Sequence, residues 1–342
     1  MADDFQLVTV IMPIRNEAEY IERSMRSVLT QDYPSDQMEV LVADGMSDDG
    51  TRAIVSKIIN DNKQIPIKLI DNPAQTVPPA LNMGLRYAQG QIIILIGGHC
   101  EITSDYVSKC VKALQSTGTD CTGGTIITIG ETVTAQAIAL AQSSFFGVGG
   151  VAFRIGQAKP GYVDTLAFGA YRRNVFKRIG HFDEDLVRNQ DDEFNFRLIQ
   201  AGGKIWLDPS IQSVYYSRAS LIKLGSQYFQ YGFYKVRVMQ KRRGVPSWRH
   251  LVPGIFVLTF AAAILISMIT TDLFWFLAIA GPYCLANLIA SFWTGRKKMR
   301  LLPLLPLAFT TLHFSYGSGF IWGIWRFRKN FRETEILKNN GR

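Results

Sequence analysis

The sequence predicts an α/β domain with a mostly parallel sheet, followed by a separate apolar region. Along the first 100 residues, short aliphatic runs alternate with helix-length amphipathic segments, which implies βαβ units with right-handed crossovers. Beyond residue 250 come three long stretches that are apolar on all sides. We therefore expect a catalytic domain at residues 1–215, an amphipathic interfacial segment at 216–250, and a membrane region with a basic tail at 251–342.

Four aliphatic runs are the predicted parallel strands, and they lie at residues 7–12, 38–43, 65–70 and 91–96. The first of them should stop at Pro13. The run at 92–96 is continuous, as expected for a strand that helices cover on both faces. The segments between the strands predict helices. The first helix carries one apolar face, and the next two are expected at 51–60 and 80–87.

The next part of the domain has a less regular pattern. We expect a helix at 104–115, a strand at 120–127, a strand and turn at 164–173, a helix that starts near residue 190, and a short strand at 205–207. Glycines at 202 and 203 mark the end of the helix that starts near residue 190. Residues 135–158 are rich in Ala, Ser and Gly, which fits either a mobile loop or a helix packed closely through small residues.

Composition separates the chain from nucleic-acid-binding proteins. The net charge is +9, and no acidic residue lies between Asp208 and Asp272, although eight basic residues do. Because this basic block leads into apolar stretches, it favours anionic lipid headgroups as its partner. The four cysteines have neither metal-type spacing nor the pattern of a disulfide framework, and we expect them to be reduced in the cytosol. The short acidic N-terminus does not resemble a signal peptide.

The first chemical signal follows the second predicted strand. Asp44 stands just past the strand end, where a carboxylate can bond a ribose hydroxyl or a base N–H, or help to hold a divalent cation. An Asx-type turn, with Ser47 or Asp48 capping the next helix, accounts for the same residues. Neither a GxGxxG nor a GxxxxGK[ST] phosphate loop occurs, which argues against dinucleotide dehydrogenases and P-loop NTPases.

Three ordered motifs resemble those of the family-2 glycosyltransferases. They are Pro-Ile-Arg-Asn-Glu at 13–17, Asp-Gly-Met-Ser-Asp-Asp-Gly-Thr at 44–51 and Asn-Met-Gly at 82–84. The resemblance spans about residues 7–215. It implies the GT-A fold, a Rossmann-like, mostly parallel sheet with flanking helices, and an inverting transfer from a nucleotide-diphospho-sugar. By the same resemblance, the donor would be bound by Pro13, Arg15, Glu17, Asp44, Asp48 and Gly98.

One departure from the family pattern falls where the fourth strand ends. The family usually has Asp-x-Asp there, and the last acid binds a metal on the donor diphosphate, whereas this chain has Gly97-Gly98-His99. His99 can replace the last Asp as a ligand of Mn²⁺ or Mg²⁺, because imidazole suits Mn²⁺ although Mg²⁺ prefers oxygen. Gly97 removes the first carboxylate of the motif.

The acceptor side is expected further along the chain. Residues 189–198 resemble the family's Glu-Asp-x-x-Leu-Asn-x-Arg helix start, which makes Asp191 the general base. The resemblance also assigns four residues to the acceptor side: Gly169, Ala170, Arg172 and Gln190. The residues alone leave another interpretation open, in which the acids at 191–193 only cap and charge the first helical turn. Arg197 would either pair with an acidic neighbour or reach the diphosphate.

The second half is predicted to be a membrane platform. Residues 220–243 interleave aromatic and basic side chains, as in an interfacial helix, with breaks expected at Gly225 and Gly232. The apolar stretches at 251–271, 273–293 and 301–325 are each long enough to span a bilayer. By the positive-inside rule, we expect the start of the first stretch and the end of the second in the cytoplasm, with residues 270–272 outside. A third crossing would leave basic residues outside, so three spans and a re-entrant hairpin both stay open.

Together these features predict an inner-membrane enzyme with a cytoplasmic catalytic domain. It would move a hexose from a nucleotide-diphospho-sugar, a UDP-sugar being favoured, to a polyprenyl-linked saccharide. Residues 168–173, 189–191 and 313–319 together resemble bacterial exopolysaccharide glucosyltransferases of the succinoglycan type, and this resemblance implies such an acceptor. The alternatives are a polyprenyl-phosphate glycosyl synthase and a catalytically inactive membrane scaffold. Expected partners are the donor, the lipid-linked acceptor and membrane lipids, with no nucleic acid. The oligomeric state is left open, a homo-oligomer included.

Overall fold

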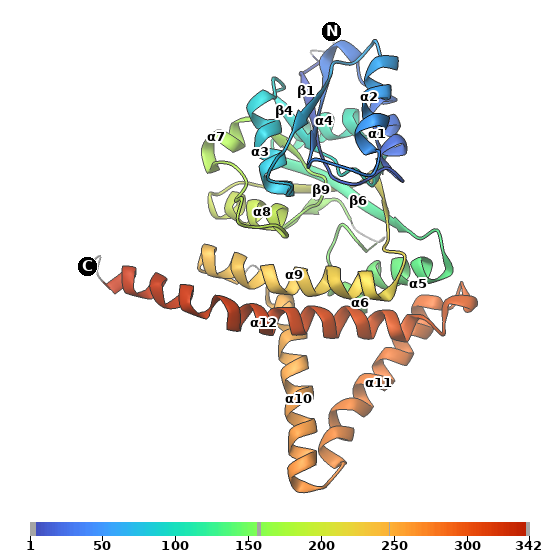
Figure 1. The fold of residues 1–342 in the computed structure, drawn as a ribbon, viewed down its shortest axis with the longest axis vertical. Helices are drawn as coiled ribbons and strands as arrows, with labels where there is room; N and C mark the ends of the chain where they lie inside the picture. Colours follow the sequence, from blue (N-terminus) through green and yellow to red (C-terminus); the bar gives the residue numbers. More distant parts are fainter. Residues whose placement is uncertain (1–4, 156–158, 246, 340–342) are drawn as a thin grey trace. The chain divides into compact units, whose positions relative to one another are not determined.

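The computed structural model describes residues 5–155, 159–245 and 247–339, with side chains as far as residue 328. The chain divides into two compact units (Figure 1). The first unit consists of Met1–Ile127 and Ala152–Tyr215, and the second of Thr128–Val151 and Tyr216–Arg342. The first unit is therefore interrupted by residues 128–151, which belong to the second unit, and all residues from 216 onward also belong to the second unit.

The first half of the first unit is the predicted series of βαβ units. Its strands are β1 (Val8–Ile14), β2 (Met38–Asp44), β3 (Ile67–Asp71) and β4 (Ile92–Leu95). They are all parallel, in the spatial order β3-β2-β1-β4. The helices between them are α1 (Ile21–Leu29), α2 (Thr51–Asp61) and α3 (Val77–Tyr87). The predicted α/β class is confirmed, and the carboxyl ends of all four strands meet at one edge of the sheet.

The sequence predicted that the first strand stops at Pro13, but the strand continues through this residue to Ile14. Side-by-side pairing with β2 continues as far as Ile14, which pairs with Asp44. Backbone groups alternate sides along a strand, so the missing N–H of Pro13 faces the β4 side. The paired part of β4 has already ended at Leu95, and the proline therefore removes no ladder hydrogen bond.

The rest of the sheet mixes parallel and antiparallel strand pairs. The order continues from β4 through β8 (Ala170–Arg172), β6 (Cys121–Ile129), β9 (Ile205–Tyr216) and β5 (Cys100–Ile102), with β7 (Gly161–Tyr162) on β9. The helices of this half are α4 (Tyr106–Thr117), α7 (Asn174–Ile179) and α8 (Gln190–Gln200). Only residues 205–207 of β9 were predicted, whereas the strand has 12 residues. Its side chains alternate between buried and half-exposed, so it lacks the aliphatic run that marks the parallel strands.

The second unit is helical among the described residues. It contains α5 (Val133–Gln142), α6 (Phe145–Val148), α9 (Leu221–Arg242), α10 (Val252–Thr270), α11 (Phe274–Gly295) and α12 (Leu305–Asn339). For residues 135–148 the helix interpretation is therefore the right one, while residues 156–158 lie outside the described part. The core of this unit joins Ile138 of α5 to Leu224 of α9 and Phe309 of α12, all fully buried.

Helices α9 and α12 lie side by side and run parallel (Figure 1). The contacts advance together along both helices, from Gly225 against Ser315 to Gln240 against Phe327. The breaks predicted at Gly225 and Gly232 do not occur, since α9 is continuous. A Cβ at Gly232 would overlap the carbonyl oxygen of Tyr316. The glycines of α9 thus allow the two backbones to approach, rather than interrupting the helix.

Helices α10 and α11 form a hairpin that projects away from the α9–α12 pair (Figure 1). Within the described residues, they are the two helices long and apolar enough to cross a membrane. At 1.5 Å per residue they are about 28 and 33 Å long. The third apolar stretch is part of α12, one continuous helix of 35 residues. The re-entrant hairpin considered from the sequence is therefore not formed.

Candidate active site

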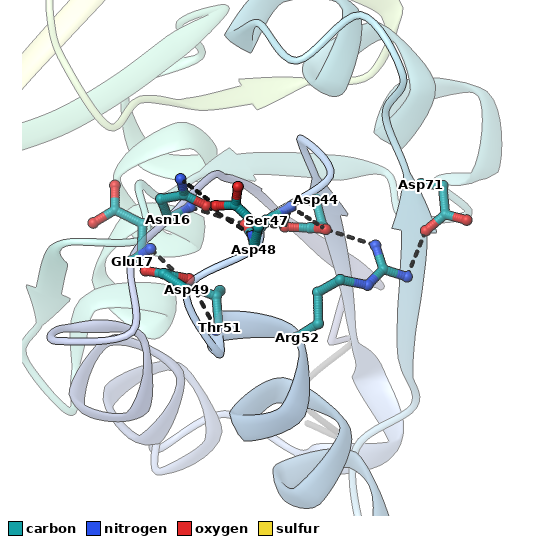
Figure 2. Close-up of polar contacts among 9 residues, drawn as sticks. All are labelled: Asn16, Glu17, Asp44, Ser47, Asp48, Asp49, Thr51, Arg52 and Asp71. Carbon is teal, nitrogen blue, oxygen red and sulfur yellow. Dashed lines mark hydrogen bonds and ion pairs between the residues drawn. The ribbon is translucent and has the colours of Figure 1, made fainter.

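The loops that follow β1 and β2 are tied together at the edge where the parallel strands end (Figure 2). Asn16 and Asp48 exchange two hydrogen bonds, from Asn16 Nδ2 to Asp48 Oδ1 (2.9 Å) and from Asp48 N to Asn16 Oδ1 (3.1 Å). The backbone N–H of Asn16 donates to Ser47 Oγ, and that of Ala18 donates to Asp49. The Asp48 carboxylate predicted to lie near the nucleoside thus fixes the shape of this double loop.

Asp44 lies at the end of β2 and its side chain is fully buried. The carboxylate accepts hydrogen bonds from the backbone and hydroxyl of Ser47. It also pairs with Arg52 of α2 at 2.6 Å, and the second arm of the same guanidinium pairs with Asp71 at the end of β3 at 2.7 Å (Figure 2). Because no part of Asp44 reaches solvent, we infer that it acts on any ligand through Ser47 and the partly exposed Arg52.

Two further predicted donor residues lie at the same edge. Pro13 is half-buried and is the last but one residue of β1, just before the loop. Arg15 is exposed, and its aliphatic stem lies across Gly45, where a Cβ would come within 3.1–3.3 Å of three Arg15 carbons. Its guanidinium donates to the carbonyl of Gln75 at 3.4 Å. Arg15 is therefore the accessible cation among the predicted donor residues.

The chain leaves β4 through a turn that presents His99. The Nδ1 atom of His99 is 2.8 Å from Oε1 of Glu17, in the loop after β1, and the two side chains are 25% and 18% exposed. The ring also packs edge-on against Tyr215 of β9, with centroids 5.2 Å apart. Gly98 lies against Glu17, where a Cβ would meet Glu17 Cγ at 2.9 Å. Within the described residues, no group of three or more His, Cys, Asp or Glu side chains is arranged to hold a metal.

Asp191 is the second residue of α8. The sequence left open whether it caps this helix, and it does not, because the cap position belongs to Asn189, whose φ is 61°. Asp191 Oδ1 accepts the N–H of Asp192 at 2.9 Å, and the side chain is half-buried. The helix N-terminus favours negative charge at this position. An ionised carboxylate with partial access to solvent is what a general base requires.

A buried asparagine fixes the start of α8 to the sheet. Asn195 accepts a hydrogen bond from the Tyr171 hydroxyl of β8 at 2.8 Å and donates to the Leu166 carbonyl at 2.9 Å. Burial raises the pKa of Tyr171 well above its ordinary value, and the neighbouring Cys121 and Asp191 raise it further. The phenol therefore stays protonated as the donor. Since Asp191 lies one turn before Asn195, this anchor sets the base relative to β8.

The other charged groups of α8 have structural partners. The Glu193 carboxylate is fully buried and is held by two guanidinium nitrogens of Arg197, at 2.7 and 3.0 Å. Arg197 also donates to the carbonyls of Ile179 and His181. Of the two roles predicted for Arg197, the pairing with an acidic neighbour is the one that the structure has.

The four predicted acceptor-side residues differ in what they can contact. Ala170 is fully buried where β8 pairs with β4, and Arg172 donates to the carbonyl of Leu114 in the last turn of α4 and to that of Thr119 just beyond the helix. We therefore do not retain these two as acceptor contacts. Gly169 lies where β8 begins, and Gln190 is the half-buried first residue of α8, next to Asp191. These two remain acceptor-side predictions.

Hydrogen bonds thus link predicted donor residues at one edge of the sheet, from Asp44 through Ser47 and Asn16 to the loop that carries Glu17, and from Glu17 to His99 in the turn after β4. Asp191 reaches the sheet by a different route, through Asn195 and Tyr171 to β8, which pairs with β4. The sequence analysis missed Arg52, Asp71 and Asn195. A signal was present only for Asn195, as the Asn of the helix-start motif.

A parallel sheet that continues into a mixed one, with polar loops gathered at the strand ends and an acidic helix start, is the arrangement expected of the GT-A class of transferases. The model of glycosyl transferase family 2 matches residues 9–180. The chain belongs to this family and is a glycosyltransferase.

Two curated relatives align along almost the whole chain. The succinoglycan biosynthesis protein ExoA of Rhizobium meliloti is 29% identical over 327 residues, which cover 94% of this chain and 95% of the relative. A dolichyl N-acetyl-α-D-glucosaminyl phosphate 3-β-D-2,3-diacetamido-2,3-dideoxy-β-D-glucuronosyltransferase of Methanococcus voltae is 28% identical over 333 residues, covering 95% of this chain and 99% of the relative.

A solved structure shares the fold. It is the mannosyltransferase PcManGT from Pyrobaculum calidifontis in complex with GDP-Man and Mn²⁺, with a TM-score of 0.60 and 18% identity, covering 94% of this chain and 88% of that one. At this identity the likeness confirms the predicted GT-A fold and carries nothing about the donor.

Proposed function

We propose that this chain is a membrane-bound, inverting hexosyltransferase that acts on a lipid-linked saccharide in surface polysaccharide synthesis. Family membership supports the transfer reaction, and the two full-length relatives are named for succinoglycan biosynthesis and for transfer to a dolichyl phosphate-linked sugar. The observation that carries the mechanism is the carboxylate of Asp191 in the first turn of α8, beside the strands that end at the donor loops.

The reaction is a single displacement at the anomeric carbon. Asp191 takes the proton of the attacking acceptor hydroxyl as that oxygen bonds to the anomeric carbon. The bond from the anomeric carbon to the diphosphate oxygen breaks on the opposite face, and the nucleoside diphosphate leaves. Asn195 and Tyr171 hold the helix that carries Asp191, while Gln190 lies next to it on the acceptor side.

The leaving diphosphate needs positive charge. A divalent cation, when bound, would neutralise the charge that develops on the diphosphate. His99 fits this role, because one ring nitrogen is bound by Glu17 and the other is available as a ligand, and the diphosphate oxygens would complete the shell. The exposed Arg15 guanidinium is a further cation at the same edge of the sheet.

The second unit supplies the membrane anchor of this proposal. Both hairpin helices carry large apolar side chains that are more than half exposed, such as Ile255, Leu258, Leu285 and Leu288. Lipid would cover such surfaces. Basic residues precede α10 and follow α11, so the positive-inside rule puts both ends of the hairpin, and with them the catalytic unit, in the cytoplasm.

The test is transfer by membranes that contain the full chain. Radiolabelled UDP-sugars and GDP-mannose are supplied with a lipid extract, and label in the lipid fraction is counted. We expect Asp191→Asn to lower transfer by about 10²–10⁴-fold, the usual contribution of a positioned base. Asp192→Asn is the matched control, because it removes a neighbouring carboxylate from the same helical turn and should leave most transfer intact.

Two results would contradict the proposal. The first is full transfer by Asp191→Asn, which would indicate an acceptor that needs no base, such as a polyprenyl phosphate. The second is the absence of transfer with every donor by the unaltered chain, at a level of expression where folded protein is present in the membrane.

A further inference from the structure

Two loops that are distant in the sequence bring a carboxylate and an imidazole together. Glu17 follows β1 and His99 follows β4, yet Glu17 Oε1 and His99 Nδ1 are 2.8 Å apart. Both side chains are largely covered, with 18% of Glu17 and 25% of His99 exposed. The pair lies at the position where the family usually carries Asp-x-Asp and this chain carries Gly97-Gly98-His99.

The local structure holds this pair in place from both sides. The hydroxyl of buried Ser24 donates to the carbonyls of Gly97 and Cys100, at 3.1 and 2.7 Å, and so fixes the turn that presents His99. The backbone N–H of Glu17 donates to Thr51 Oγ1 at 2.8 Å. The geometry of the pair is therefore built by the fold rather than by a chance contact of two mobile side chains.

The glycine at 98 is a condition for the contact. A Cβ there would lie 2.9 Å from Glu17 Cγ and 3.0 Å from Ile14 Cγ2. Contacts that short force the neighbour to move. In contrast, a Cβ at Gly97 would meet only the Phe168 ring, at 3.6 Å. The turn thus has room for a side chain at 97, while at 98 any side chain would push Glu17 away from His99.

The pairing determines which nitrogen of His99 can bind a ligand. An ionised carboxylate only accepts hydrogen bonds, so the proton of the neutral ring is assigned to Nδ1 and the lone pair to Nε2. Metal-binding histidines in proteins commonly have this arrangement, in which a carboxylate fixes the tautomer, orients the ring and raises the basicity of the free nitrogen. The packing of the ring against Tyr215 restricts its rotation further.

We propose that Glu17 is a positioning residue for His99, and that this pair replaces the missing Asp-x-Asp by presenting His99 Nε2 to a divalent cation on the donor diphosphate. The inference rests on the proposed function, because the cation serves the leaving diphosphate. It assigns Glu17 a role different from the nucleoside contact that the family resemblance implied. It also gives a reason for glycine at 98, since the carboxylate arrives from another loop and needs that space.

The experiment measures Mn²⁺ binding instead of sugar transfer. The full chain is purified in detergent, and free Mn²⁺ is titrated by electron paramagnetic resonance with UDP or with GDP present. Nitrogen coordination is read from ¹⁴N modulation in electron spin echoes of the bound ion. His99→Ala should abolish this modulation. Glu17→Ala should weaken Mn²⁺ binding by about 10–100-fold, the usual effect of removing the carboxylate behind a metal-binding histidine.

Two further variants separate positioning from other effects. Glu19→Ala removes an exposed carboxylate of the same loop and should leave Mn²⁺ affinity unchanged. Gly98→Ala keeps both members of the pair but displaces Glu17, so it should weaken Mn²⁺ binding as Glu17→Ala does. Circular dichroism of each variant shows whether it is folded.

Nucleotide binding without metal is the second readout. Under this proposal Glu17→Ala leaves it unchanged, whereas a loss of metal-free UDP and GDP binding would show that Glu17 contacts the nucleoside and would overturn the inference. Wild-type Mn²⁺ affinity in Glu17→Ala, or ¹⁴N modulation that survives His99→Ala, would overturn it too. None of these outcomes affects the transfer reaction or the role of Asp191, so failure of the inference and failure of the proposed function are distinguishable.

Discussion

The guanidinium of Arg52 holds the buried carboxylate of Asp44, and its removal should destabilise the first unit. The pair is short, at 2.6 Å, with Asp44 fully buried and the Arg52 side chain 36% exposed. Loss of one partner from a buried ion pair costs about 3–5 kcal/mol, because a charge is left without its counter-charge, while an exposed pair contributes about 0–1 kcal/mol. Since one partner is buried and the other is partly exposed, we expect Arg52→Ala to cost about 2–3 kcal/mol.

In a unit of this size, such a loss corresponds to a fall in Tm of about 4–12 °C. The assay is thermal unfolding of the full chain in detergent. Asp71→Asn is the matched control, because Asp71 binds the other arm of the same guanidinium but is 62% exposed. It should cost less than about 1 kcal/mol.

The double variant Arg52→Ala/Asp44→Asn tests the physical cause. If the penalty comes from a buried carboxylate without a counter-charge, neutralising that carboxylate should recover part of the lost Tm. The reasoning is refuted if the double variant is less stable than Arg52→Ala alone, or if Asp71→Asn costs as much as Arg52→Ala.

Two more predictions concern side chains that position larger elements. Asn195→Ala leaves the buried Tyr171 hydroxyl without its acceptor, which should lower the free energy of unfolding by about 1–3 kcal/mol. It should also lower kcat for transfer, because the helix that carries Asp191 loses its anchor, and an unchanged kcat would contradict this. Gly232→Ala should lower the free energy of unfolding by about 1–3 kcal/mol, because the added methyl group overpacks against Tyr316. Gly281→Ala on α11 is the control, since a Cβ there has nothing within 4 Å, and it should be neutral or stabilising. Equal changes of Tm in the two variants would disprove the prediction.

The parallel half of the sheet was predictable because its strands are buried on both faces. A short, continuous aliphatic run such as 92–96, bounded by turn residues, is typical of a strand that helices cover on both sides. Two strands of the mixed half give no such signal. β5 has three residues, and the 12 residues of β9 alternate in burial and contain Pro209, so only the aliphatic start at Ile205 was recognised. For these strands the neighbours, rather than the local sequence, determine the structure.

The candidate site was predictable as a list of residues, but their partners were not. The sequence singled out Asp44 and His99 from their place at strand ends. It did not indicate that Arg52 would cover Asp44, or that Glu17, 82 residues away, would bind His99. Such pairs depend on which loops the sheet order brings together, and one sequence does not contain that information locally.

The insertion of residues 128–151 into the catalytic half has a practical consequence. Its helix α5 forms part of the second unit's core, where Ile138 packs with residues of α9 and α12. A chain cut after Tyr215 would still carry α5 but would lack both partner helices, leaving an apolar surface in water. Attempts to isolate the catalytic half by truncation should therefore yield aggregates unless residues 128–151 are also replaced by a short polar linker.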